Sequence, residues 1–262
     1  MARHELTHVA SYERTLQASL ERAWENVLDW EHLPWLHRDA FASIEREDSG
    51  SWGWRARVRL RPDQGREVRL ELLVERDAGR YVTRTLDGRG AGSEIWTRLT
   101  PLAADRTQVE VGFHLPGVPP QRREQLGLSY VALYTRLWDE DETMMRRRQR
   151  ELDRARAEPT GPLCLGREDE LRKQLPLCVE LAGRRWRVLE HGGELLVHAA
   201  SCPHMLGPLE QAEPEAGQIR CPWHGYAFDL RSGRSTDGRG LRLPRAPRVE
   251  VDAAGEVRLV SA

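Results

Sequence analysis

The sequence predicts an α+β chain in which a domain with a curved antiparallel sheet and one long helix precedes an all-β domain. Three observations predict this order. Apolar residues alternate with arginine and glutamate from residue 41 to residue 115, as in a sheet with one buried and one solvated face. A helical pattern then covers 121–157, and short strand-like segments return after residue 164. We therefore expect domains at 1–157 and 164–262, with a linker containing proline and glycine at 158–163.

The N-terminal domain is expected to begin with a strand at 9–18 and two short helices. Ser19 fits a helix N-cap, and apolar residues recur at helical spacing from Leu20 to about Glu31. Pro34 should push Leu33 out of the helical region and start a second short helix with proline in its first turn. Strands bounded by turn residues follow at 41–47, 52–60, 67–76, 80–86, 93–100 and 107–114.

The C-terminal domain is expected to consist of short strands separated by hairpin turns. Two of these turns are Gly192-Gly193 and Ala253-Ala254-Gly255. The predicted strands are 177–180, 185–191, 194–199, 218–221, 227–230, 249–251 and 257–260.

Composition excludes several classes of function. The chain has 40 basic and 41 acidic residues, a formal net charge of −1, which gives no sign of a nucleic-acid or anionic-membrane partner. Its apolar runs are too short to span a membrane, and no signal-peptide core follows the first residues. We expect a cytoplasmic protein. In that reducing compartment, Cys164 and Cys178 are expected to be small buried apolar groups, with a disulfide as the alternative.

Two pairs of metal-binding residues dominate the C-terminal domain. Cys202 and His204 form a C-x-H pair, and Cys221 and His224 form a C-x-x-H pair, with sixteen residues between His204 and Cys221. A [2Fe–2S] cluster with two cysteines on one iron and two histidines on the other is a Rieske centre. Zinc also accepts two cysteines and two histidines, but a zinc finger places both cysteines in one half-site. The arrangement predicts a Rieske cluster, with zinc as the alternative.

The residues around these ligands extend the pattern. Cys202-Pro-His-Met-Leu-Gly207 and Cys221-Pro-Trp-His-Gly225 resemble the Rieske domains of ring-hydroxylating oxygenases and ferredoxins. In respiratory Rieske proteins a disulfide joins the two cluster loops, and the resemblance puts Gly207 and Trp223 in place of its cysteines. The chain has no flavin or nicotinamide motif, so the resemblance implies a separate reductase or ferredoxin as the electron donor.

The order of elements before the linker also resembles a known fold. A strand, two short helices, a curved antiparallel sheet and a long helix resemble the helix-grip fold (START/Bet v1-like, SRPBCC). That fold leaves an apolar cavity between its sheet and its long helix. Ring-hydroxylating oxygenases combine such a domain with a Rieske domain in the opposite order, so this chain would carry the two domains reversed.

The stretch Asn26-Val-Leu-Asp29-Trp-Glu-His32-Leu-Pro-Trp-Leu-His37 suggests a second metal centre. Two histidines and one carboxylate leave open positions on a mononuclear non-haem Fe(II), as oxygen activation requires. The stretch resembles the oxygenase segment that supplies two histidine ligands and a bridging aspartate. On a regular helix His32 and His37 would lie about 140° apart, so the break at Pro34 is needed for both to reach one metal. The alternative is a polar bend without metal.

The third ligand is expected from the acidic run Asp139-Glu140-Asp141-Glu142 of the long helix. Asp141 fills a gap in an apolar stripe, whereas Asp139 and Glu140 are expected to face solvent. By resemblance, the carboxylate ligand of the oxygenases sits on this late helix, a role that falls on Asp141. The alternative is a surface run paired with 146–148. The stripe consists of Val131, Tyr134, Trp138 and Met145.

Asp29 is expected to support the iron site without binding the metal. A hydrogen bond to His32 would fix the tautomer of that imidazole. The resemblance further implies that Asp29 bridges to a Rieske histidine, His204 or His224. The alternative is an aspartate on the solvated side of a short helix.

Together these features predict a Rieske-type oxygenase. It would use a [2Fe–2S] cluster, Fe(II) and O2 to oxidise a hydrophobic small molecule, with aromatic compounds among the candidates. Family analogy implies a homotrimer. The alternative is a Rieske ferredoxin-like electron carrier fused to a metal-free helix-grip domain that binds a hydrophobic ligand. A third reading is a helix-grip cyclase or hydrolase with His32 or His37 as general base.

Overall fold

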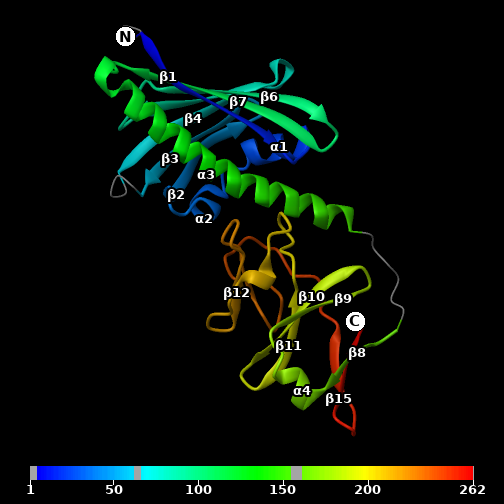
Figure 1. The fold of residues 1–262 in the computed structure, drawn as a ribbon. Coiled ribbons are helices and arrows are strands. Elements are labelled where there is room, and N and C mark those ends of the chain that lie inside the picture. The colour runs from blue at the N-terminus through cyan, green and yellow to red at the C-terminus, as the bar shows by residue number, and fades with distance from the viewer. Residues whose placement is uncertain (1–4, 62–65, 155–160, 262) are drawn as a thin grey trace. The chain divides into compact units, whose positions relative to one another are not determined.

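The computed structural model describes residues 5–61, 66–154 and 161–261. The chain forms two compact units that divide between Arg146 and Arg147 (Figure 1). The first is a helix-grip-like domain and the second is an all-β domain, which confirms the predicted fold class. Part of the predicted linker, 158–160, lies outside the described residues, so the limits 1–157 and 164–262 stay predictions.

The first unit is built on one seven-stranded antiparallel sheet. Strands β2 to β7 follow one another as a meander, and β1 pairs with β7, giving the order β1-β7-β6-β5-β4-β3-β2. Alternating burial along these strands leaves one face apolar, as the sequence predicts. The strands are β1 (Leu6–Leu16), β2 (Phe41–Gly50), β3 (Gly53–Leu60), β4 (Glu67–Glu75), β5 (Arg80–Asp87), β6 (Glu94–Ala103) and β7 (Arg106–Pro116).

Two short helices separate β1 from β2. Helix α1 (Leu20–Leu28) begins at the predicted N-cap, where Ser19 Oγ accepts a hydrogen bond from Arg22 N at 3.2 Å. It ends three residues before the expected Glu31. Helix α2 (Leu33–Leu36) has proline in its first turn, as predicted, but Leu33 is its first residue and not outside it. A residue before proline is sterically disfavoured in the helical conformation. Here hydrogen bonds from Leu36 N to His32 O and from His37 N to Leu33 O hold Leu33 in the turn against that preference.

Helix α3 (Pro120–Asp153) is the long helix, and in Figure 1 it runs along the sheet. Tyr130 and Tyr134 pack on Phe113 of β7, with ring centroids 5.1 and 4.8 Å apart. At Gly127, a Cβ atom would lie 2.7 Å from the carbonyl oxygen of Val9, so the helix approaches β1 closely there. The predicted end at residue 157 lies outside the described residues. No helix within 5–61, 66–154 or 161–261 is long and apolar enough to cross a membrane.

The second unit contains three small antiparallel sheets, ordered β11-β10-β9, β12-β13 and β14-β15-β8. The predicted strands are present, but β8, which begins at Leu163, and the short helix α4 were not predicted. Both are five residues long, too short to show a clear period. The elements are β8 (Leu163–Arg167), α4 (Glu168–Arg172), β9 (Leu177–Leu181), β10 (Arg184–His191), β11 (Glu194–Ala199), β12 (Gln218–Arg220), β13 (Ala227–Asp229), β14 (Arg248–Val251) and β15 (Glu256–Val260).

The expectation that Cys164 and Cys178 are buried is wrong. Both thiols are free and exposed. Their neighbours on β8 and β9 pack into the core of this unit, and successive strand residues point to opposite faces, so each cysteine faces solvent. Cys164 Sγ donates a hydrogen bond to Glu256 Oε2 at 3.2 Å.

Candidate functional site

Helix α2 holds two histidines in place at its two ends. His32 is its N-cap and His37 its C-cap, and the C-cap residue has left the helical conformation (φ −96°, ψ 40°). The turn is closed by hydrogen bonds from Leu36 N to His32 O and from His37 N to Leu33 O. As a result the imidazoles turn toward each other, with centroids 5.1 Å apart. The expected break at Pro34 is not what brings them together, because α2 continues through Pro34. The separation of about 140° on a regular helix does not apply because His37, as C-cap, has left the helical conformation.

Asp141 of α3 lies against both imidazoles. Its Oδ1 is 3.4 Å from His32 Nε2 and 3.0 Å from His37 Nε2, and it accepts a hydrogen bond from Asn26 Nδ2 at 2.9 Å. One donor atom from each of His32, His37 and Asp141 lies within 4.8 Å of the other two, and all three residues are buried. The structure therefore brings together the three residues that the sequence nominated as one metal site.

Each histidine has a carboxylate behind it. Asp29 Oδ2 lies 3.5 Å from His32 Nδ1, and His37 Nδ1 donates to Glu140 Oε2 at 2.5 Å. The expectation that Glu140 faces solvent is therefore wrong. Glu140 lies about 100° around the helix from Asp141 and therefore off the apolar stripe. Its carboxylate still reaches His37 Nδ1, because α2 packs close to this side of α3. The acidic run alone gave no signal for this contact.

The rest of the acidic run binds an arginine from the sheet. Arg14 of β1 contacts Asp139 and Glu142, each at 2.5 Å. Glu142 is also buried and accepts a hydrogen bond from Gln17 N at 2.9 Å. Asp139 is exposed, as expected, whereas Glu142 anchors α3 to β1.

The field at the three-residue cluster favours a positive charge. Burial acts to lower the pKa of His37, but the charge of Asp141 and hydrogen bonds to Asp141 and Glu140 raise it above its ordinary value. Burial acts to raise the pKa of Asp141, but the charge and hydrogen bond of His37, the charge of His32 and the Asn26 amide hold it below its ordinary value. The carboxylate is therefore ionised, and a cation beside it is stabilised.

A cavity of about 130 Å³ opens beside this cluster, between the sheet and α3. Besides the polar cluster its walls are mostly apolar and aromatic. Tyr81 and Tyr134 both line it, and burial raises the pKa of each phenol, so both are neutral. The remaining wall residues include Phe41, Trp54, Leu70, Leu72, Leu137 and Trp138.

In the second unit, the two Cys–His pairs sit on loops with the same backbone hydrogen bonds. Cys202 N donates to Gly207 O and Leu206 N donates to Cys202 O, at 2.9 and 3.0 Å. In the other loop, Cys221 N donates to Tyr226 O and Gly225 N donates to Cys221 O, at 2.8 and 2.9 Å. The fifth residue of each loop has positive φ, 63° at Leu206 and 69° at Gly225. Leucine pays a steric cost there that glycine avoids, which indicates that the loop geometry is imposed by its surroundings.

These loops bring the four predicted cluster ligands together. Both cysteines and His224 are buried, His204 is half-buried, and the two imidazole centroids are 4.6 Å apart. The hydrogen bond from Cys202 lowers the pKa of Cys221 below its ordinary value, and the same contact raises that of Cys202. Two adjacent sulfurs and two adjacent imidazoles fit a cluster with one iron on each pair. Tyr226, for which the sequence indicates no role, stacks on His204 with ring centroids 4.3 Å apart.

Gly207 leaves space beside the sulfur of Cys221. A Cβ atom at this position would lie 2.6 Å from Cys221 Sγ and 3.1 Å from the Trp223 ring. We expect Gly207→Ala to displace that sulfur and to lower the cluster content of the purified protein by half or more, because overpacking of this kind costs about 1–3 kcal/mol. The visible absorbance of the cluster per chain measures the effect. Full cluster content in the variant would contradict this account of the loop.

Comparison with known proteins identifies the second unit. A family model for the Rieske [2Fe-2S] domain matches residues 161–247. Apoptosis-inducing factor 3 of Mus musculus and of Homo sapiens is 35% identical over 63 residues, which cover 24% of this chain and 10% of each relative. The chain thus spans about a tenth of the length of these curated relatives.

Solved structures resemble each part of the chain separately. The ferredoxin of carbazole 1,9a-dioxygenase from Nocardioides aromaticivorans IC177 aligns over its whole length with 39% of this chain (25% identity, TM-score 0.34). The ZhuI aromatase/cyclase from Streptomyces sp. R1128 aligns over 98% of its length with 56% of this chain (15% identity, TM-score 0.47). From the family match and the four converging ligands, we conclude that residues 161–247 form a Rieske [2Fe-2S] domain.

Proposed function

We propose that the chain is a Rieske-type oxygenase whose first unit binds a mononuclear non-haem Fe(II) through His32, His37 and Asp141. The observation that carries the proposal is the convergence of one Asp141 oxygen with the Nε2 atoms of both histidines in a buried site. Two imidazoles and one carboxylate are the donor set that leaves positions open on Fe(II) for oxygen. The two cysteines and two histidines on the Rieske loops fit the [2Fe–2S] cluster. When bound, the cluster would supply single electrons and Fe(II) would supply the oxygen-binding positions.

The protein's own residues would orient the imidazoles and surround them with an apolar wall. Hydrogen bonding of His37 Nδ1–H to Glu140, and the carboxylate of Asp29 beside His32 Nδ1, would keep a proton on each Nδ1. Each Nε2, which faces Asp141, would then be the nitrogen that gives up its proton to bind a metal. The amide of Asn26 fixes the shared carboxylate oxygen. Aromatic and aliphatic walls provide an apolar surface for the substrate.

The size of the cavity limits the substrate. In another protein, an apolar cavity of about 150 Å³ binds benzene, so about 130 Å³ accommodates a compound of roughly that size. We therefore propose a small hydrophobic substrate with at most one ring at the reacting end. The electrons would come from a separate reductase or ferredoxin.

One observation favours a second candidate, an electron carrier with a metal-free first unit. Asp141 and Glu140 each contact a ring nitrogen of His37, so both nitrogens of this imidazole have partners without iron. In that case the Rieske domain would be the only redox centre and the cavity would hold a hydrophobic ligand.

Metal analysis separates the two candidates. The oxygenase is expected to contain three irons per chain, two in the cluster and one on the histidines, and His32→Ala is expected to contain two. Because the cluster is unaffected, its visible absorbance should not change in the variant. A matched control, His8→Ala, removes an exposed histidine of β1 and should retain three irons. Two irons in the unmodified protein after reconstitution with Fe(II) would exclude the oxygenase and leave the electron carrier.

A further inference from the structure

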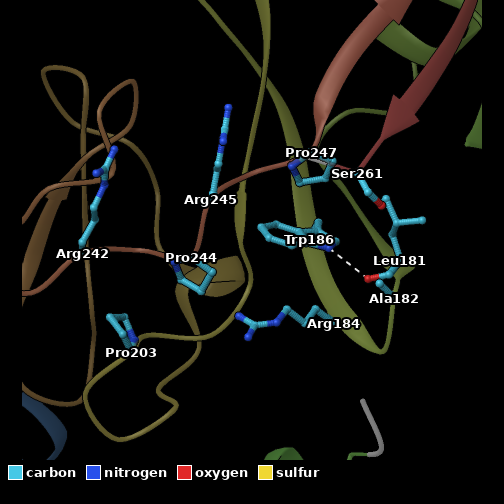
Figure 2. A pocket seen from close by; sticks show the side chains of 10 residues that line it. All are labelled: Leu181, Ala182, Arg184, Trp186, Pro203, Arg242, Pro244, Arg245, Pro247 and Ser261. Carbon is cyan, nitrogen blue, oxygen red and sulfur yellow. Dashed lines mark hydrogen bonds between the residues drawn. The ribbon is translucent and has the colours of Figure 1, made fainter. Parts of the chain in front are cut away.

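A hollow in the second unit lies beside the first cluster loop and is lined by arginine (Figure 2). Its volume is about 540 Å³. Arg184 at the start of β10 and Arg242 and Arg245 from the segment before β14 contribute guanidinium groups. Trp186 lies among them, buried and held by a hydrogen bond from its Nε1 to Leu181 O at 3.3 Å. The hollow is also lined by Pro203, Pro244 and Pro247.

The charge of this hollow is not balanced. No aspartate or glutamate lines it, and all three arginines are exposed. Within the part of the chain that the structure describes, no ion pair involves these three guanidinium groups, whereas other arginines of this unit, such as Arg172 and Arg258, contact carboxylates. The sequence from 230 to 248 contains six arginines and one aspartate. In a chain of nearly zero net charge, this is a concentrated positive surface.

The hollow is next to a cluster ligand. Pro203, one of its walls, is the residue between Cys202 and His204. Of the two histidine ligands, His204 is half-buried, whereas His224 is only 1% exposed. The rate of electron transfer falls steeply with distance. A partner protein is therefore expected to exchange electrons with the cluster at the edge nearest solvent. A partner seated in this hollow would lie against the loop that carries that edge.

We propose that this arginine-lined hollow docks an acidic surface of the protein that exchanges electrons with the Rieske domain. Three separated and exposed guanidinium groups suit a protein surface with several carboxylates, because arginine is enriched at interfaces and pairs with carboxylates through two hydrogen bonds. Opposite charges would raise the rate of encounter and orient the partner toward His204. The inference rests on the Rieske domain alone and holds for an oxygenase and for an electron carrier.

The test measures how fast an acidic redox protein reduces the oxidised cluster. A reduced plant-type [2Fe–2S] ferredoxin, which is strongly acidic, serves as the probe in stopped-flow mixing with the full chain carrying its cluster. We expect the double variant Arg242→Glu/Arg245→Glu to lower the second-order rate constant by about tenfold or more at low salt. The difference should shrink at roughly 1 M salt, where the Debye length is about 3 Å.

Two controls keep the result specific. Arg167→Glu/Arg258→Glu makes the same change of net charge at exposed arginines of β8 and β15 outside the hollow and should retain most of the rate. Reduction by the small cationic methyl viologen radical should not slow in either variant. If the double reversal does not fold, the single neutral variants Arg184→Gln, Arg242→Gln and Arg245→Gln should each lower the ferredoxin rate by about two- to fivefold.

Two results would overturn the proposal. One is equal slowing by the control pair and the hollow pair, which would mean that only net charge matters. The other is an unchanged ferredoxin rate in the hollow variants combined with loss of inorganic phosphate binding measured by calorimetry. That result would make the hollow a site for small anions and not a docking surface.

Discussion

Asp141→Asn is expected to remove the third iron and to lower the rate of substrate oxidation by about a thousandfold or more. The substitution keeps the shape of the side chain but replaces the carboxylate with a neutral amide. In the present arrangement one oxygen of Asp141 faces both Nε2 atoms and the Asn26 amide. An asparagine cannot balance the charge of a divalent metal, and its NH2 group could turn toward the imidazoles and occupy the position that the metal needs.

Glu142→Gln is the matched control. Glu142 is one residue further along the same helix and equally buried, but its partners are Arg14 and Gln17 N. We expect this variant to lose roughly 1.5–3 kcal/mol of stability, because it weakens hydrogen bonds to a charged group, while it retains three irons. Iron content and urea unfolding of both variants give the comparison. Retention of the third iron by Asp141→Asn, or its loss in Glu142→Gln, would contradict the assignment.

Much of this site could be predicted from sequence because local rules determine it. Pro34 indicates the first turn of a second short helix, and His32 and His37 lie at the two ends of that single turn. Asp141 interrupts an apolar stripe, which indicates a carboxylate directed at the core. Both inferences need only the period of a helix and the properties of proline.

The parts that could not be predicted depend on distances between elements. Glu140 lies off the apolar stripe, and its contact with His37 exists only because α2 packs near that side of α3. Arg184, Pro203 and Arg242 are well separated in the sequence, so their common hollow follows from packing and not from a motif. Positive φ at Leu206 was equally hidden, since leucine normally indicates a residue outside the left-handed region.

The second large effect concerns pH and a histidine outside the cluster loops. His198 of β11 is buried, and its Nδ1–H donates to Ala199 O at 2.8 Å. Burial lowers its pKa to about 4. The hydrogen bond to Ala199 O offsets part of this shift, and the nearby charge of Arg187 on β10 adds a smaller lowering. Its Nε2 has no hydrogen-bond partner among the described residues, so a proton there would create a buried cation without an acceptor.

This depressed pKa makes the folded state less stable in acid. An unfolded histidine titrates near 6.5, so between about pH 6.5 and pH 4 the unfolded chain binds a proton that the folded chain does not. The contribution of His198 is therefore complete above pH 6.5 and is lost as the pH falls toward 4. At about 1.4 kcal/mol per pKa unit, the loss is on the order of 3 kcal/mol.

His198→Gln should remove this dependence. Urea unfolding of the second unit, followed by the visible circular dichroism of the cluster, gives stability at pH 7 and at pH 4.5. Other groups also titrate in this range, so the informative quantity is the difference between the two proteins: the unmodified chain should lose about 2–3 kcal/mol more than the variant. His8→Gln, at an exposed position of β1, should behave like the unmodified chain. Parallel losses in all three proteins would mean that His198 is protonated in the folded state, and that the space around Nε2 admits water.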